Sequence, residues 1–555
     1  MNKDIGNHGL FRDFIRPAKK EWIEKVKTDL KGADFNQRLV WKNINGIELQ
    51  PFYTREDQKE LLKNTGHSAE NVVNYRRIDV YDAVEANRLA SKAIEEGMNG
   101  ILFEIHTQAA PESLLKNIDL STTVVSFILS KEQRDFSVQY SSYLEGLNLS
   151  QEKIKGYIDL NFIPAYLTGG KLETTIFEDL KKLALLFKSY PNFKTLMISG
   201  TVYQDSGSNQ VQEIAYTLNS MVFLIDELTQ RELKPQFIFD QLVFTLGISS
   251  SYFVEIGKFR AFNSLLSELA KKYPVILHPT DLVAKTSVWS KSVTDANTNM
   301  LRATTEAMSA ILGNATAIEI DPYDHQFKKS NDFSRRISGN IANILKEEAY
   351  FGKVSNPVKG SFYIEELSLQ LAGKALELFK QTEAKGGFFK QIENENIKSG
   401  IAEIRLEKIR LLTQRKQAMV GVNKYPNLME ALSIDILSDT VIQQNSKLLF
   451  PRRAGIELEQ IRLNTERFVR AKGYRPTVEI ASFGNPATAK ARAAFSYDFM
   501  GITAYEIKDE KSYAEAGEAA VKTASSKSDI VVICSSDNDY RAHALEFVRT
   551  FRSLN

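Results

Sequence analysis

Two patterns of apolar positions occur along the chain: short continuous runs, and stretches in which every third or fourth residue is apolar. Between residues 71 and 330, short apolar runs alternate with amphipathic stretches such as 82–97 and 177–190, whose apolar residues recur every three to four positions. The apolar runs predict strands at 99–105, 121–129, 156–163, 194–200, 235–240, 273–279 and 315–321. Strands that alternate with helices indicate βα units, and over this length they favour an eight-stranded (β/α) barrel. The pattern does not place the eighth strand.

The segments around this region differ in pattern. Residues 1–70 are expected to form an N-terminal arm, with a helix that stops near Gly32 and a hairpin around Asn45-Gly46. We assign 71–385 to the barrel and 386–474 to a helical linker packed on it.

The last segment, 475–555, has the order of a small α/β unit. Strands are predicted at 475–484, 502–507 and 529–536, with helices at 487–501, 513–527 and the end of the chain. This β-α-β-α-β-α order predicts a flavodoxin-like or Rossmann-like domain. Because such sheets commonly carry five strands, the domain is expected to be incomplete here.

Composition narrows the possible functions. Lys and Arg total 71 against 69 for Asp and Glu, which argues against a broad surface that neutralises nucleic-acid phosphates. Cys534 is the only cysteine, and the six histidines form no His-x-x-x-His pair, so Cys-clustered and zincin-type metal sites are excluded. No apolar run reaches the ~18 residues of a membrane span, and the start lacks a signal-peptide pattern. A cytoplasmic protein is therefore expected.

Carboxylates near predicted strand ends are the first candidates for chemistry, because barrel active sites lie at the carboxyl ends of the strands. These are Glu104, Asp240, Glu319 and Asp321. Two of them could form a glycosidase pair, although ion pairs with Lys or Arg are the ordinary alternative. His278 could act as a base at a strand end but is more typical of a structural histidine. Asp324, His325 and Lys424 are expected to be loop residues.

The C-terminal unit offers little chemistry of its own. A dinucleotide site needs Gly-x-Gly-x-x-Gly at the first strand–helix turn, whereas only Gly484 is present and Pro486 removes an amide donor. A response-regulator receiver needs clustered acids, and only Glu479 and Asp537 lie near the strands. Cys534 lies in the run IVVIC, where a cysteine usually acts as a small apolar side chain.

Several stretches resemble the methylmalonyl-CoA mutase family along essentially the whole chain. They are GIELQPFYTREDQ, MISGTVYQDSGSNQVQEIAYTL, SYFVEIGKFRAF, NDFSRRISGNIANIL, NPVKGSFYIEEL and VGVNKYPN. The resemblance implies a (β/α) barrel, a linker and a cobalamin-binding-type domain. It also implies adenosylcobalamin-dependent interconversion of succinyl-CoA and methylmalonyl-CoA.

The family's cobalamin motif does not carry over. Asp-x-His-x-x-Gly corresponds to Pro486, Thr488 and Ala491, so the cobalt-ligating imidazole is a threonine. The later Ser-x-Leu element corresponds to 535–537, with an acid in place of leucine. The resemblance therefore implies no cofactor-binding or metal-ligating residue in this chain.

The family's barrel residues are also altered. Ile-Ser-Gly-Tyr-His-x-Gln reads as residues 198–204 here, and its histidine is Val202, which cannot donate a hydrogen bond or transfer a proton. No arginine lies between 136 and 230 to clamp a carboxylate. Tyr75 is a possible remnant of the family's tyrosine near the first strand.

Three family residues are missing: the cobalt-ligating histidine, the barrel histidine and the arginine that binds the substrate carboxylate. The resemblance implies the non-catalytic small (beta) subunit of a heterodimer, whose partner large (alpha) subunit binds the cofactor. Three alternatives remain: an active single-chain cobalamin-dependent mutase, a barrel hydrolase using Glu104 with Asp240 or Glu319, and a regulatory subunit that binds CoA without turnover.

Overall fold

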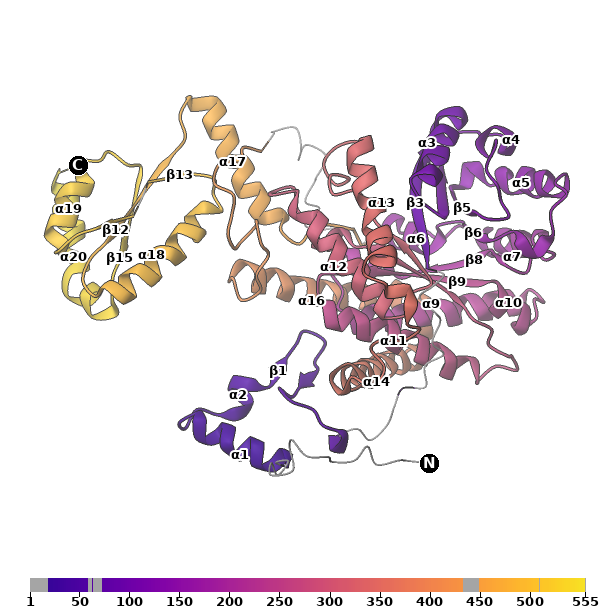
Figure 1. The fold of residues 1–555 in the computed structure, drawn as a ribbon, viewed down its shortest axis with the longest axis horizontal. Coiled ribbons are helices and arrows are strands. Elements are labelled where there is room, and N and C mark those ends of the chain that lie inside the picture. The colour runs from indigo at the N-terminus through magenta and orange to yellow at the C-terminus, as the bar shows by residue number, and fades with distance from the viewer. Residues whose placement is uncertain (1–17, 58–61, 63–71, 433–448, 509, 555) are drawn as a thin grey trace.

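The structure is a computed structural model of the 555-residue chain, and it describes residues 18–57, 62, 72–432, 449–508 and 510–554. The N-terminal arm contains α1 (Lys19–Asp29), α2 (Phe35–Leu39), β1 (Trp41–Lys42) and β2 (Glu48–Leu49). β1 and β2 pair as the antiparallel hairpin that Asn45-Gly46 predicts, and Gly46 has a φ of +68°. In Figure 1 the arm lies beside α14.

Nine parallel strands form a nearly closed barrel in the order β7-β6-β5-β4-β3-β11-β10-β9-β8. They are β3 (Val73–Val80), β4 (Gly100–Ile105), β5 (Val124–Leu129), β6 (Gly156–Asp159), β7 (Phe193–Lys194), β8 (Leu196–Ser199), β9 (Leu242–Ile248), β10 (Asp281–Thr286) and β11 (Ala317–Glu319). Only Thr195 separates β7 from β8, so one interrupted strand pairs with β6 at its start and with β9 at its end. Counted in this way, the barrel has the eight strands that the sequence predicts.

Helices cover the outside of the barrel (Figure 1). The helices of the barrel region are α3 (Ala83–Glu95), α4 (Pro111–Leu114), α5 (Asp135–Glu145), α6 (Phe162–Gly169), α7 (Ile176–Leu186), the short α8 (Thr201–Asp205) at the end of β8, α9 (Gln210–Gln230), α10 (Pro235–Gln241), α11 (Tyr252–Ala270), α12 (Thr298–Leu312) and α13 (Asp332–Glu347). Then follow α14 (Phe362–Ala384), α15 (Gly387–Glu393), α16 (Asn396–Thr413) and α17 (Ile456–Lys472). Across the described residues, none of the helices combines the length and apolar composition that crossing a membrane requires.

Two predicted strands are wrong. Residues 235–240 belong to α10, because Pro235 occupies the first helical turn, where its missing N–H costs nothing, and β9 follows directly. Residues 273–279 form no strand, and Ile276 is 73% exposed. The strand in that region is β10, which begins only after Pro279. The unplaced eighth strand is β3.

The C-terminal unit has the predicted order. It contains β12 (Thr477–Ser482), α18 (Pro486–Gly501), β13 (Glu506–Ile507), β14 (Lys511–Ser512), α19 (Ala516–Ala524), β15 (Ile530–Cys534) and α20 (Asp537–Leu554). Central β12 pairs in parallel with β13 and β14 along one edge and with β15 along the other. Asp498 of α18 binds Arg415 and Lys424 of the linker at 2.8 and 2.9 Å, which ties the unit to the linker.

Candidate functional site

The barrel interior is filled by two layers of side chains. The first, which we call the apolar layer, consists of Tyr75, Leu102, Tyr157, Met197, Val243, Val283 and Ala317. Each of these residues is at most 5% exposed. Because side chains on a strand return to the same face every second residue, the next interior positions lie two residues further along each strand. The barrel is therefore a packed core at this level, as (β/α) barrels generally are.

Tyr75 is part of this packing. Its hydroxyl bonds to the Ser126 hydroxyl at 2.8 Å, and its ring meets the Tyr157 ring edge-on at 5.8 Å. Burial raises the pKa of Tyr75 far above its ordinary value. The Tyr75 hydroxyl is therefore held as a neutral, bonded group inside the barrel.

The second layer, which we call the polar layer, lies nearer the carboxyl ends of the strands. It consists of Arg77, Glu104, Asp159, Ser199, Thr245, Lys285 and Glu319. Arg77 donates to Glu104 with its Nε at 2.9 Å and reaches Glu319 with Nη1 at 3.5 Å, and Lys285 binds Glu319 at 2.9 Å. The two carboxylates that reasoning from sequence proposed for a hydrolase, Glu104 and Glu319, are thus bridged by one guanidinium.

The pKa values of two buried acids at this end of the barrel shift in opposite directions. Burial raises the pKa of Asp159 to about 7, against a smaller lowering by the Asn161 amide and Arg77. Burial also acts to raise the pKa of Asp321, but Lys285, His325 and Arg77 together outweigh it and hold this pKa below its usual value. Nearby positive charges therefore favour the ionised form of Asp321, whereas burial favours the protonated form of Asp159.

The remaining barrel candidates lie elsewhere. Asp240 is in α10, before β9, so its placement at a strand's carboxyl end is wrong. Its Oδ1 accepts from Gln236 at 2.9 Å and lies 3.9 Å from the exposed His278. Asp324 accepts a hydrogen bond from Ser330 at 3.0 Å. These residues do not join the polar layer.

A group of three side chains at the barrel mouth, which the sequence pattern did not identify, could hold a metal ion. Asp79, Glu104 and His106 offer ligand atoms within 4.8 Å of one another. Glu104 lies on β4, His106 follows directly after it, and Asp79 lies on the neighbouring β3; a period of two places all three side chains on one face. His106 Nε2 lies 3.0 Å from Asp79 Oδ1, and Arg77 already neutralises Glu104.

Val202 lies in the first turn of α8, directly after β8. It is 3% exposed and belongs to the main hydrophobic core. The nearby Gln204 is fully buried, and neither of its amide atoms has a hydrogen-bond partner among the described residues. Position 202 at this end of the barrel is therefore occupied by a buried apolar side chain that cannot transfer a proton.

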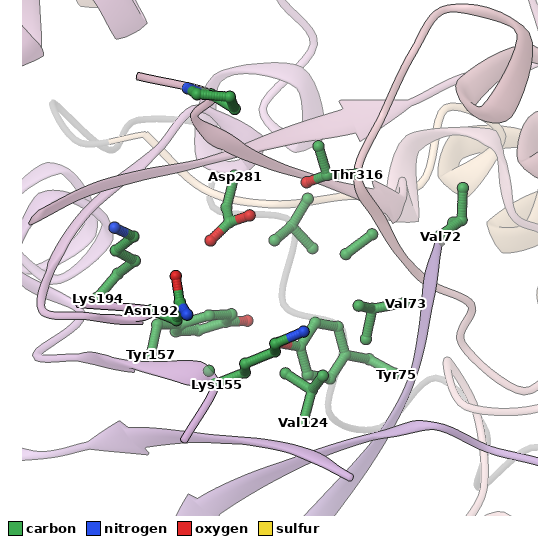
Figure 2. Close-up of a pocket in the computed structure, with 14 residues that line it drawn as sticks. Val72, Val73, Tyr75, Val124, Lys155, Tyr157, Asn192, Lys194, Asp281 and Thr316 are labelled. Carbon is green, nitrogen blue, oxygen red and sulfur yellow. The ribbon is translucent and has the colours of Figure 1, made fainter. Parts of the chain in front are cut away.

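A cavity of about 410 Å³ opens at the opposite end of the barrel, where the strands begin. Figure 2 shows Tyr75 and Tyr157 of the apolar layer on its wall, with Lys155, Lys194 and Asp281 around it. Lys194 Nζ donates to the Asp240 carbonyl at 2.6 Å. The apolar layer lies between this cavity and the polar layer.

The first strand–helix turn of the C-terminal unit is closed by its own residues. Pro486 begins α18, the Asn485 side chain accepts from the Thr488 amide at 3.2 Å, and Ala491 is exposed. A threonine hydroxyl and two apolar side chains supply no imidazole for cobalt at this turn. The residues present therefore do not fit the cobalt-ligating arrangement of cobalamin.

Asp539 occupies the crevice beyond this turn, at the carboxyl ends of β12 and β15. Its Oδ2 accepts from the Asn485 amide at 3.3 Å, from the Ser535 hydroxyl at 2.8 Å, and from the Ser536 amide and hydroxyl at 3.3 and 2.6 Å. The hydrogen bonds from Ser536, Ser535 and Asn485 lower the pKa of Asp539 to about 2. In such sheets this crevice is the usual ligand site, and here it holds a carboxylate of the same chain.

The other candidates of the unit take structural positions. Glu479 is fully buried and binds Lys511 at 3.1 Å, while Asp537 pairs with Arg492 at 2.5 Å. Cys534 is 1% exposed, and burial raises the pKa of its thiol. No acidic cluster of the receiver type forms from these residues.

Comparison with known proteins gives consistent matches. The family described as Methylmalonyl-CoA mutase matches residues 89–449. The protein named methylmalonyl-CoA mutase small subunit from Porphyromonas gingivalis is 30% identical, over 96% of this chain and 90% of that protein. The protein of the same name from Streptomyces virginiae is 24% identical over 96% and 88%. The protein named methylmalonyl-CoA mutase from Escherichia coli is 26% identical over 77% and 67%.

Proposed function

The chain belongs to the methylmalonyl-CoA mutase family, and we propose that it is the non-catalytic small subunit of a heterodimeric, cytoplasmic mutase. Its partner, the large subunit, would bind adenosylcobalamin and interconvert succinyl-CoA and methylmalonyl-CoA. The observation that carries the proposal is the absence of an imidazole at both Val202 and Thr488, the positions that match the family's two histidines.

The C-terminal crevice supports the proposal. Cobalt ligation from below requires a nitrogen lone pair, which neither Thr488 nor Ala491 carries. A cofactor tail entering between β12 and β15 would displace the Asp539 carboxylate and its four hydrogen bonds. Hydrogen bonds to a charged acceptor are stronger than those between neutral groups, so this displacement is unfavourable.

Two residues of the barrel also support the proposal. Valine at 202 cannot contact a thioester carbonyl through a hydrogen bond, and its side chain is buried. Arg77 of the polar layer is engaged by Glu104 and Glu319 and is not free to clamp a substrate carboxylate.

The proposed partner follows from the relatives named small subunit, whose similarity extends over 96% of this chain. A permanent heterodimer buries about 2,000–5,000 Å² or more. In the complex this chain would stabilise the large subunit rather than contribute reacting groups.

The experiment is co-purification with the large subunit, compared with each chain alone. We expect one-to-one co-elution, a cobalamin absorbance that follows the large subunit, and no cobalamin on this chain alone. Stoichiometric cobalamin binding or mutase activity by this chain alone would overturn the proposal.

A matched variant sharpens this test. Thr488→Val removes the hydroxyl at nearly constant volume and keeps the backbone amide that Asn485 caps. We expect the complex carrying it to keep its activity and its cobalamin spectrum. A loss of bound cobalamin at unchanged co-elution would show that position 488 serves the cofactor after all.

A further inference from the structure

A second large cavity lies outside the barrel axis. It has a volume of about 750 Å³ and is enclosed by the β1–β2 hairpin, the loops after β9 and β10, α12, α16 and the loop 416–420. We call it the arm–linker cavity. Its volume falls within the range of about 300–1,000 Å³ that is typical of small-molecule sites. None of the positions that match the family's altered motifs lines it.

The charged groups that the structure describes on its wall are all cations. Lys42, Arg302, Lys408 and Lys416 line the cavity, and among the described residues no aspartate or glutamate lines it. Lys42 is neutralised by Glu48 at 2.6 Å. The others leave an excess of positive charge facing the cavity.

Lys408 is the central cation. Its ammonium donates to the Ser208 carbonyl and lies 5.2 Å from the centre of the Trp289 ring. Within the described part of the chain, no carboxylate lies within 4.0 Å of it. Glu213 and Glu255, the acids behind it, are instead paired with the buried Lys258 at 2.8 and 2.5 Å. Burial lowers the pKa of Lys408 to about 8, so a nearby anion would relieve an uncompensated charge.

Polar donors lie beside apolar walls. The Asn43 amide nitrogen is buried and has no hydrogen-bond partner among the residues that the structure covers. Trp41 is 47% exposed and Leu301 is 69% exposed, and both line the cavity together with Trp289. An indole face combined with an ammonium suits a ligand that carries a negative group on a planar apolar body.

We propose that the arm–linker cavity binds a small organic anion, with its carboxylate or phosphate group at Lys408 and its apolar body between Trp289 and Trp41. The site draws on the arm, the barrel and the linker. It stands apart from the polar layer, and its existence does not depend on the proposed subunit role.

Tryptophan fluorescence tests the proposal on the full chain. Trp41 and Trp289 line the cavity, while the third tryptophan, Trp22, packs on Phe52 at 5.1 Å. The probes are 1-naphthoate, adenosine monophosphate and inorganic phosphate. We expect saturable quenching by at least one organic probe: naphthoate alone identifies a carboxylate site, and the nucleotide alone a phosphate site. Failure of both organic probes to bind at millimolar concentration would overturn the proposal.

Variants separate charge from folding. Lys408→Met should weaken binding at least 10-fold, and Lys408→Arg should retain most of it. Lys374→Met, at an exposed lysine of α14 outside the cavity, is the matched control and should bind like the wild type. Circular dichroism checks that each variant is folded. Unchanged affinity in folded Lys408→Met, or equal weakening by Lys374→Met, would contradict the assignment.

Discussion

Replacing Asp159 by asparagine should stabilise the protein relative to the wild type, by an amount that increases as the pH rises. The carboxyl of Asp159 lies in the polar layer, is 9% exposed and has a pKa raised to about 7 by burial. In the unfolded chain the same carboxyl has a pKa of about 3.9. Between these values the folded state keeps a proton that the unfolded state releases, so the wild type loses stability with rising pH. Asparagine mimics the protonated acid and cannot ionise.

The magnitude follows from the pKa. Each pH unit in this window corresponds to about 1.36 kcal/mol. From pH 5 to pH 7 the variant should therefore gain about 2–3 kcal/mol relative to the wild type, and its Oδ1 can still accept from the Asn161 amide as Asp159 does. Above the folded pKa the gain should level off.

The assay is urea unfolding of both proteins at pH 5, 6, 7 and 8, followed through far-ultraviolet circular dichroism. Asp321→Asn is the matched control, because the pKa of Asp321 is lowered in the folded state. Its carboxylate contributes stability above the unfolded pKa that is lost only as the pH falls through the lower folded value. The control should be destabilised by an amount that is constant from pH 5 to pH 7. A flat difference for Asp159→Asn, or equal slopes for the two variants, would refute the reasoning.

Three further predictions concern packing and turns. Gly484→Ala should destabilise the C-terminal unit by about 1–3 kcal/mol, because its φ is +77° and a Cβ would lie 2.2 Å from Asp539 Oδ2; pairing it with Asp539→Ala should recover part of the loss in thermal unfolding. Asn45→Ala should cost about 1–3 kcal/mol by removing its 3.0 Å bond to Gln210, read out as faster proteolysis of the arm, and an unchanged rate would contradict it. Leu463→Ala, in the fully buried side of α17, should cost about 2–5 kcal/mol in urea unfolding, and a loss below 1 kcal/mol would contradict it.

Most of the fold is readable from local pattern. Runs such as 99–105 and 121–129 are correct because strands of a parallel sheet are buried on both faces and read as continuous apolar stretches. β3 escapes this pattern because Arg76 and Arg77 interrupt it. Arg76 is buried and reaches Ser338 at 3.4 Å, while Arg77 enters the polar layer. Partners distant in the chain decide the position of both residues.

The candidate site, too, depends on contacts between residues that are distant in the chain. The sequence indicates which side chains stand at positions 202 and 488, because a short motif carries them. It does not indicate that Asp539 fills the crevice beside Asn485, since the two residues come from different strand–helix units and meet only in the folded sheet. The bridging of Glu104 and Glu319 by Arg77 likewise depends on strand register.

The interruption of one strand at Thr195 leaves only a short ladder on one side of β6, and this is the line along which we expect the barrel to open. β7 pairs with Gly156 and Tyr157 of β6, and the chain then passes to β9, so the described ladder on this side of β6 stops before Asp159. Opening along this line would admit water to the Asp159 carboxyl and allow it to ionise. We therefore expect the barrel to open along this line more often in alkaline solution. The interrupted strand pairing would then make the frequency of opening depend on pH.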